Sequence, residues 1–546
     1  MVVAISGPTD ETIVSGLTAL SPGCSLTLQG LDCNFGTGLA ACPSSANCYK
    51  ATVTTYDAYD STTNTIPSGA AALSISETAF TVADNQTTNV NFPFSGIPAQ
   101  IAVVAGNALT QQSGTVYNLI GPGAHPFFAE ALDADGNLIA GIGGPSYTIS
   151  LSDNALQASV TEPASGSPRF TVSPPAALDL TDTATLDVEA SYPSGETDGC
   201  SYAGAVCSGA VTLDMQSLLA VLGNGVNLYA AEKGTGPIST ITSGVNDGLA
   251  TDLEFDSNGN LYVSVANPYG ASGTGAVYEY NLGSTIVGRT ITSGLDQPTH
   301  MAFDSAGNLF VLNAAGSVTE YAAGGTTPIK TIHVVSDGTW LSLDANDDLW
   351  VMAHPGGPFA SGPPATSGTV TYYANGSSSG VTLAGLTDPS GMVVNPLNDE
   401  LFVSDQNVIV SGTPYDCNAD CNLYEYAPGS STGTLASSTA YCGDLAYLYS
   451  NATYSYVIAD DACSPEFSMY RVQSPSSPFA AWNGGLTNPA GATNAVVVDQ
   501  QGYVFYASSF YQAVYEFDAY RAQNAPQPVV TITNGVGAPS RLAIIQ

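Results

Sequence analysis

One phrase recurs through the C-terminal part of the chain and restricts its fold more than any other feature. Its copies are FDSNGNLYVSV from Phe255, FDSAGNLFVLN from Phe303, LDANDDLWVMA from Leu343, VNPLNDELFVSD from Val394 and VDQQGYVFYAS from Val498, with a weaker copy, LYSNATYSYVIAD, from Leu448. In each copy an Asp or Asn tolerates the backbone of a tight turn, and the alternating apolar residues that follow suit a strand. Each copy therefore predicts a strand, a turn and a second strand.

A second phrase follows each copy and predicts a third strand. It reads VYEYN from Val277, VTEYA from Val318, VTYYA from Val370, LYEYA from Leu423, MYRVQ from Met469 and VYEFD from Val514. A seventh copy, VNLYA from Val226, has no first strand in front of it. The missing strand is expected at the other end of the chain, because PSRLAIIQ from Pro539 matches PTHMAF from Pro298. We expect residues 539–546 to pair beside residues 218–222.

The spacing of the repeats is that of β-propeller blades, at about 41 to 53 residues. Residues 216–546 are predicted to form a seven-bladed propeller, with six blades as the alternative. The C-terminal strand would close it and remove open sheet edges. The phrases resemble those of NHL-repeat and streptogramin-lyase-like propellers, which carry the same strand, D-x-x-G-N turn and strand. That resemblance implies only the fold, because no catalytic motif of that group can be matched residue by residue.

The N-terminal part shows alternating segments between turn-rich spacers, which is typical of β-sandwiches. We expect one sandwich over residues 1–97 and a second over residues 98–215, with a joint near Gly96. The second contains the hairpin ALDADGNLI from Ala131. Both modules resemble bacterial Ig-like or transthyretin-like sandwiches. The whole chain is therefore predicted to be all-β, with two sandwiches followed by a propeller.

Charge restricts the partners of the chain. It carries 46 Asp and Glu against only eight Lys and Arg, for a formal net charge of -38. Nucleic acids and anionic membranes require basic groups that neutralise phosphates, so neither is expected as a partner. No stretch reaches the roughly 20 apolar residues of a membrane span. So few ion pairs suit an acidic exterior, because little is lost when carboxylates are protonated.

Cysteine usage points to an oxidising compartment. The ten cysteines fall in even local groups: Cys24, Cys33, Cys42 and Cys48; Cys200 and Cys207; and Cys417, Cys421, Cys442 and Cys463. Even counts within each predicted domain are typical of disulfides, and a zinc site would require four close ligands. We expect a secreted or cell-surface protein whose export signal has been removed, since the first residues do not form one.

Repeat alignment predicts where a functional site would lie. Equivalent starts of the first strands would meet around the mouth of the central channel; they are Asp252, His300, Trp340, Gly391, Ala495 and Arg541, with Asp444 or Leu445 in the weak sixth blade. Loops after the second strands open at the same face and bring Tyr269, His354 and Asp405. The same construction places Cys417 and Cys421 at a loop neck, with Cys442 tied to Cys463.

These residues leave three classes of function open. In a binding or adhesion protein, Trp340, Tyr269, Arg541 and Asp405 would recognise a glycan, a peptide or a protein. In a metal-dependent lyase or lactonase, Asp252 and His300 would be metal ligands or an acid/base pair, with His354 as a second base. A structural surface-layer or matrix protein also fits. No G-x-S-x-G elbow, HExxH pair or phosphate-binding loop occurs, so binding without a cofactor is the leading interpretation and a divalent metal the alternative.

Overall fold

The computed structural model of the chain is all-β; among the described residues the one helix is a 3-10 turn, η1 (Gly199–Ser201). No helix in the described part is long and apolar enough to cross a bilayer. The structure describes residues 1–546 except 17–23, 28–29, 34–37, 44–45, 85, 142, 176–181, 195–196, 232–235, 246–248, 267–274, 336, 354–367, 396–397, 407–420, 441–444, 449–455, 461–466, 472–477, 483–493, 500–502, 519–527 and 546. Of residues 24–27, 30–33, 406, 421, 439–440, 445–448, 456–460, 467–471, 478–482, 494 and 518 only the backbone is described.

The chain divides into two compact units. Unit 1 comprises Met1–Asn118, Ala124–Pro174 and Thr183–Asp214. Unit 2 comprises Leu119–Gly123, Pro175–Asp182 and Met215–Gln546. The boundary between the expected sandwiches at residue 97 falls inside unit 1, and the three-domain division stays a prediction.

Unit 1 begins with one five-stranded sheet and a short hairpin. The sheet has the order β2 (Glu11–Val14), β1 (Val2–Ser6), β5 (Tyr49–Tyr56), β6 (Ala72–Phe80) and β7 (Ser95–Gly96). The hairpin pairs β3 (Cys24–Thr27) with β4 (Gly30–Cys33). Alternation along β5 buries Tyr49, Ala51 and Val53 with residues of β1. A disulfide joins Cys42 to Cys48 beside this core.

Two further sheets of unit 1 pack face to face. One has the order β12 (Ser146–Ser152), β15 (Thr183–Ser191), β16 (Ser208–Gln216), β10 (Val116–Ile120) and β9 (Thr110–Ser113); the other has the order β13 (Ser159–Thr161), β14 (Arg169–Ser173), β11 (His125–Leu132) and β8 (Gln100–Ala105). Tyr117 of the first sheet meets Phe127 of the second edge to face, with ring centroids 5.6 Å apart. Phe127 in turn stacks on Phe170. The predicted Cys200–Cys207 disulfide is present.

Unit 2 contains seven described sheets, each of four antiparallel strands. In order from the first strand outward, six of them are β20 (Leu249–Phe255), β21 (Leu261–Ala266), β22 (Gly275–Tyr280) and β23 (Arg289–Ile291); β24 (Pro298–Phe303), β25 (Leu309–Asn313), β26 (Ser317–Tyr321) and β27 (Pro328–His333); β28 (Gly338–Leu343), β29 (Leu349–Ala353), β30 (Thr369–Tyr373) and β31 (Val381–Thr382); β32 (Pro389–Val394), β33 (Leu401–Gln406), β34 (Cys421–Tyr426) and β35 (Thr434–Ala440); β36 (Leu445–Leu448), β37 (Tyr456–Asp460), β38 (Phe467–Arg471) and β39 (Pro478–Trp482); and β40 (Asn494–Val498), β41 (Tyr503–Ser508), β42 (Ala513–Asp518) and β43 (Val530–Ile532).

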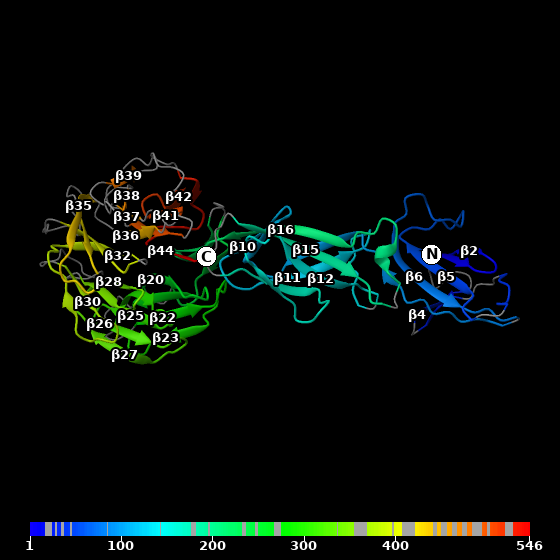
Figure 1. The fold of residues 1–546 in the computed structure, drawn as a ribbon, viewed down its shortest axis with the longest axis horizontal. Helices are drawn as coiled ribbons and strands as arrows, with labels where there is room; N and C mark the ends of the chain where they lie inside the picture. Colours follow the sequence, from blue (N-terminus) through cyan, green and yellow to red (C-terminus); the bar gives the residue numbers. More distant parts are fainter. Residues whose placement is uncertain are drawn as a thin grey trace. The chain divides into compact units, whose positions relative to one another are not determined.

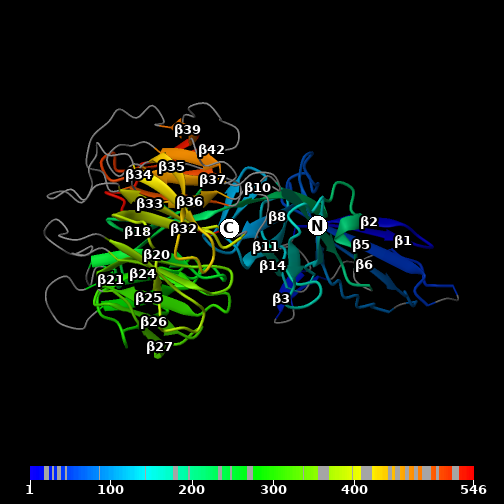
Figure 2. The same cartoon turned by 60° about the vertical axis from the view of Figure 1, so that its left-hand side comes forward.

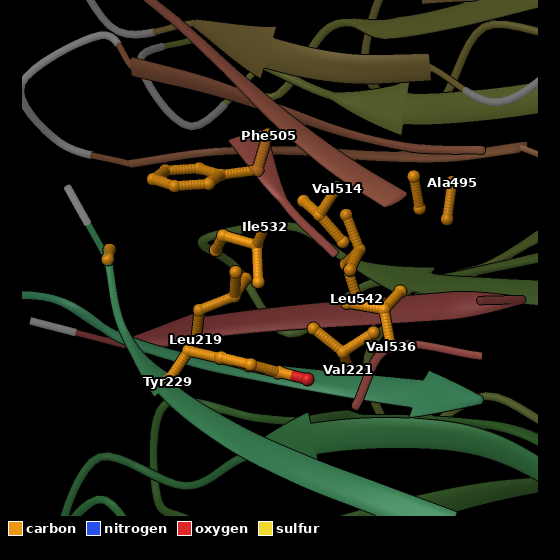
Figure 3. Packing of buried hydrophobic residues seen from close by; sticks show 11 residues of the cluster. Leu219, Val221, Tyr229, Ala495, Phe505, Val514, Ile532, Val536 and Leu542 are labelled. Atoms are coloured by element: carbon orange, nitrogen blue, oxygen red, sulfur yellow. The ribbon is translucent and has the colours of Figure 1, made fainter. Parts of the chain in front are cut away.

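The seventh sheet is built from both ends of unit 2, as the repeats predict. It has the order β44 (Arg541–Ile545), β17 (Leu218–Gly223), β18 (Gly225–Ala230) and β19 (Ser239–Ile241). Its register runs from Leu218 opposite Ile545 to Leu222 opposite Arg541. Figure 3 shows apolar side chains of this sheet, among them Leu219 and Leu542, packed with Phe505 and Val514 of the preceding sheet. The C-terminal strand therefore belongs to a shared core.

The first strands of the sheets contact one another in sequence. β20 contacts β24, and the series continues through β28, β32, β36 and β40 to β44, which also contacts β20. The fourth strands lie at the periphery, as β27 and β39 do at opposite edges of unit 2 in both views (Figures 1 and 2). A residue at an equivalent position of each first strand is thus brought close to those of the other sheets.

The recurring turn forms as its residues predict. Asp256 Oδ1 accepts hydrogen bonds from the backbone N–H groups of Asn258 and Asn260, at 2.9 and 2.8 Å. Asp304 makes the same pair of bonds in the next sheet. Gly259 lies in the left-handed region with φ of 80°, a conformation that glycine adopts without strain. The Asp and the Gly of the phrase therefore fix the turn rather than a ligand.

Neighbouring sheets are also joined through the tyrosine of the second phrase. Its hydroxyl donates to a backbone carbonyl in the loop after the outer strand of the preceding sheet. The pairs are Tyr280 with Ser243, Tyr321 with Ser293, Tyr426 with Ala384 and Tyr229 with Asn534. The last pair joins the composite sheet to the sheet of β40–β43, so the same contact recurs at the junction of the chain's two ends.

Candidate functional site

A repeated β-bulge positions the residues that the repeat alignment singled out. In four sheets the pairing of the first strand with the second shifts by one residue, and the next paired residue is Asp252, His300, Trp340 or Gly391. Bulges redirect side chains and increase the local twist. The predicted equivalence of these four positions is therefore confirmed, and the bulge explains how the site residues are presented.

A hydroxyl residue occupies each bulge, and sequence reasoning missed it. Thr251 Oγ1 donates to Pro298 O of the neighbouring sheet at 2.8 Å, and Thr299 Oγ1 donates to Gly338 O of the next sheet at 3.0 Å. Thr339 and Ser390 follow in the next two sheets. The signal was in the sequence, since TD, TH, TW and SG precede equivalent strands. These bonds hold adjacent first strands together directly behind the site.

Asp252 and His300 lie together and are almost completely buried. Their side chains are 4% and 10% exposed, and His300 Nδ1 lies 3.5 Å from Asp252 Oδ2. The same carboxylate oxygen accepts a hydrogen bond from the backbone N–H of Met301 at 2.8 Å. His300 Nδ1 also lies 3.2 Å from the carbonyl oxygen of Met301. The carboxylate and the imidazole are thus fixed by the backbone of β24.

Trp340 and Arg541 complete the group. The indole lies 4.4 Å from the imidazole of His300, centroid to centroid, and the guanidinium carbon of Arg541 lies 5.5 Å from the indole centroid. Arg541 Nε is 3.8 Å from Asp252 Oδ1. Since β20 and β24 lie between β44 and β28, the Arg541–Trp340 contact crosses the interior that the first strands enclose. We call these four residues the first-strand cluster.

The cluster is rigid on one side and accessible on the other. Trp340 packs against a buried core that includes Met352 and Met392, yet the residue stays partly exposed. The side chain of Arg541 is 29% exposed, and its Nε has no hydrogen-bond partner. A fixed aromatic ring beside unsatisfied donors is a typical arrangement of a recognition site.

The tautomer of His300 follows from its surroundings. Burial lowers the pKa of this imidazole, with Asp252 opposing the change and Arg541 adding to it, so the ring is neutral at neutral pH. Its Nδ1 faces two acceptors, the Met301 carbonyl and the Asp252 carboxylate, and therefore carries the hydrogen. The other nitrogen, Nε2, keeps its lone pair.

Glu254, two residues along β20 from Asp252, is a group that sequence reasoning missed. Residues two apart on a strand face the same side, so Glu254 follows Asp252 along that face. Burial, with a contribution from Asp252, raises the pKa of the Glu254 carboxyl to about 8. The side chain retains partial exposure despite these enclosed surroundings. At neutral pH Glu254 is mostly protonated, and the charges near the cluster are those of Asp252 and Arg541, which offset each other.

The residues of the cluster do not fit a divalent metal. The described residues contain no group of three or more His, Cys, Asp or Glu side chains that could hold one. The pair of Asp252 and His300 lies beside the Arg541 guanidinium, which repels a cation. A structural or catalytic zinc usually has three or four protein ligands. The predicted third group, His354, lies outside the described residues.

The remaining predicted residues have different fates. Asp405 is buried, and its carboxylate accepts hydrogen bonds from the backbone N–H groups of Thr387 and Asp388, so it organises a loop and offers no exposed binding group. Ala495 and Gly391 are buried and add no polar group. Outside the described residues or side chains lie Tyr269, Asp444, Leu445, Cys24, Cys33, Cys417, Cys421, Cys442 and Cys463. The backbone pairs Cys24 opposite Cys33 in the hairpin of β3 and β4.

The fold and the cluster define an all-β, disulfide-containing protein with a preformed polar and aromatic site. The chain matches no protein-family model and no curated protein sequence. Among solved structures it is similar to hydrazine synthase of Kuenenia stuttgartiensis, with 15% identity, a TM-score of 0.38, and coverage of 52% of this chain and 79% of that chain. It is also similar to a chain of a mitotic checkpoint complex, with 12% identity, a TM-score of 0.40, and coverage of 54% and 80%.

Proposed function

We propose that residues 216–546 form a seven-bladed β-propeller, closed by β44, whose first-strand cluster recognises an extracellular ligand. The chain would act after secretion or at the cell surface, with the N-terminal sandwiches carrying the propeller. The observation that supports recognition most is the placement of Trp340, between the buried His300–Asp252 pair and the half-exposed Arg541. The compositional argument against nucleic acid and anionic membranes still applies.

The contacts between neighbouring sheets support the closed ring. β44 pairs with β17 and lies against β40 and β20. The hydroxyl of Tyr229 donates to Asn534 O at 2.9 Å across the junction, as Tyr321 does to Ser293 O between two interior sheets. Closure of a propeller removes the exposed edges of its end sheets. The two described disulfides, Cys42–Cys48 and Cys200–Cys207, support an oxidising compartment.

The geometry favours recognition over catalysis. Asp252 Oδ2 is engaged by Met301 N–H, and the cluster does not fit a metal. A neutral imidazole held by a carboxylate could act as a base, but the described residues place no second group as acid or nucleophile beside it. The lyase or lactonase alternative therefore has less support. A purely structural role would leave the unsatisfied Arg541 Nε unexplained.

The test is a binding screen with the full chain. The immobilised protein is probed in parallel with a panel of purified glycans, a peptide library and purified extracellular matrix proteins, as wild type and as Trp340→Ala. Phe510→Ala is the matched control, because Phe510 is an aromatic residue of the same unit that is 57% exposed and outside the cluster. We expect a ligand whose binding is lost in Trp340→Ala and kept in Phe510→Ala. Equal binding by all three proteins would contradict the proposed site.

A further inference from the structure

The hydrogen-bonding groups that the first-strand cluster leaves free define what it can bind. Neither His300 Nε2 nor Trp340 Nε1 has a hydrogen-bond partner among the described residues. Arg541 Nε is likewise unsatisfied, while one terminal nitrogen of its guanidinium donates to Ser540 O. The cluster therefore offers one acceptor, the lone pair of His300 Nε2, and donors from Trp340 and Arg541. These groups lie within one set of ring contacts.

A mixed set of this kind discriminates between ligand groups. A carboxylate has only acceptor atoms and would face the lone pair of His300 Nε2, unless the buried imidazole took up a proton. A hydroxyl group can donate to His300 Nε2 and accept from Trp340 or Arg541 at the same time. Leaving a buried polar group unpaired costs roughly 1–3 kcal/mol, so the hydroxyl is preferred.

The electrostatics point in the same direction. The charges of Asp252 and Arg541 offset each other at 3.8 Å. The chain as a whole has a formal net charge of -38, which opposes the approach of anions. The partly exposed indole of Trp340 adds a flat apolar surface to the polar groups. A neutral ring compound that carries hydroxyl groups and an apolar face matches all three properties.

We propose that the first-strand cluster binds a neutral saccharide, with a pair of sugar hydroxyls between His300 Nε2 and the donors of Trp340 and Arg541. This inference rests on the proposed recognition function and names the ligand class of that site. The apolar face of the sugar ring packs on the indole. Acidic sugars and peptides with exposed carboxylates bind more weakly.

The experiment is isothermal titration of the full chain at about pH 7.5 with defined tetrasaccharides. The probes are cellotetraose, maltotetraose, xylotetraose and mannotetraose as neutral sugars, and tetragalacturonate as the acidic sugar. Trp340→Phe removes the indole N–H and keeps an aromatic ring, so it is the informative variant if Trp340→Ala does not fold. Phe510→Ala is again the control outside the cluster.

We expect at least one neutral tetrasaccharide to bind, and tetragalacturonate to bind at least about tenfold more weakly than that sugar. Trp340→Phe should weaken the neutral sugar about 3- to 10-fold, as expected for one lost hydrogen bond. Equal or tighter binding of tetragalacturonate, or the absence of binding by every neutral probe, would overturn the inference. If peptides or matrix proteins then bind in a Trp340-dependent way, the recognition function stands and only the ligand class is wrong. If no ligand depends on Trp340, both fail.

Discussion

Replacing Leu542 by alanine tests whether the C-terminal strand stabilises unit 2. Leu542 is 7% exposed, lies opposite Val221 in the register of β44 and β17, and belongs to the core cluster shared with the preceding sheet (Figure 3). Truncation of a buried leucine to alanine costs about 2–5 kcal/mol. Because β44 ends the chain and can relax around the cavity, we expect the lower part of that range, about 2–3 kcal/mol.

The assay is urea denaturation of the full chain followed by tryptophan fluorescence. All three tryptophans lie in unit 2, so this signal reports its unfolding separately from unit 1. Ile286→Ala is the control, because Ile286 is 75% exposed and its truncation should change the free energy of unfolding by less than about 0.5 kcal/mol. Hydrogen exchange should show faster exchange of the β17 amides in Leu542→Ala. A change as small as that of Ile286→Ala would refute the structural role of β44.

Three further changes test other parts of the structure. Because the raised pKa of Glu254 makes its ionisation unfavourable in the folded chain, unfolding stability should fall by about 2 kcal/mol between about pH 6.5 and 8.5, and Glu254→Gln should reduce that fall. Tyr321→Phe removes a hydrogen bond between two sheets and should cost about 1 kcal/mol in urea denaturation, whereas Tyr59→Phe, on an exposed surface, should cost less than half of that. Reduction of the Cys200–Cys207 disulfide should destabilise unit 1 by about 2 kcal/mol and lower its melting temperature, since the bridge closes a short loop.

Each of these outcomes has a clear counterpart. A stability that rises from about pH 6.5 to 8.5 would show that Glu254 ionises normally in the folded chain. Equal effects of the two tyrosine variants would show that the hydroxyl of Tyr321 adds nothing beyond a surface hydrogen bond. An unchanged melting temperature of unit 1 after reduction would show that the short bridge does not restrict its unfolded state.

The sequence predicted the positions of the cluster because the repeats are register marks. The turn phrase FDSNGN and its copies align the strands, and the alignment alone places His300 and Trp340 at equivalent positions. The pairing of residues 218–222 with the C-terminus was predicted by the same means, since one strand was missing at one end and surplus at the other.

What the sequence could not predict depends on side-chain geometry across sheets. Asp405 follows an apolar strand in a polar loop and was expected to be exposed, yet it is buried because two backbone N–H groups point at its carboxylate. Glu254 has a raised pKa through its enclosed surroundings and the nearby Asp252, which no linear pattern shows. The bonds of Thr251 and Thr299 connect residues 47 and 39 apart, and only the packed ring of first strands brings those atoms together.

The most direct test of the central claim is the protonation state of His300. The recognition site that we propose depends on a neutral imidazole with its hydrogen on Nδ1, where Met301 O and Asp252 accept it, and with Nε2 free beside Trp340. Nitrogen NMR of the full chain labelled at histidine measures this directly, and a His300→Gln sample assigns the signal among the four histidines. At about pH 7.5 the account predicts the Nδ1–H tautomer and a change at Nε2 when a neutral sugar is added. An Nε2–H tautomer, or an imidazolium at that pH, would contradict it.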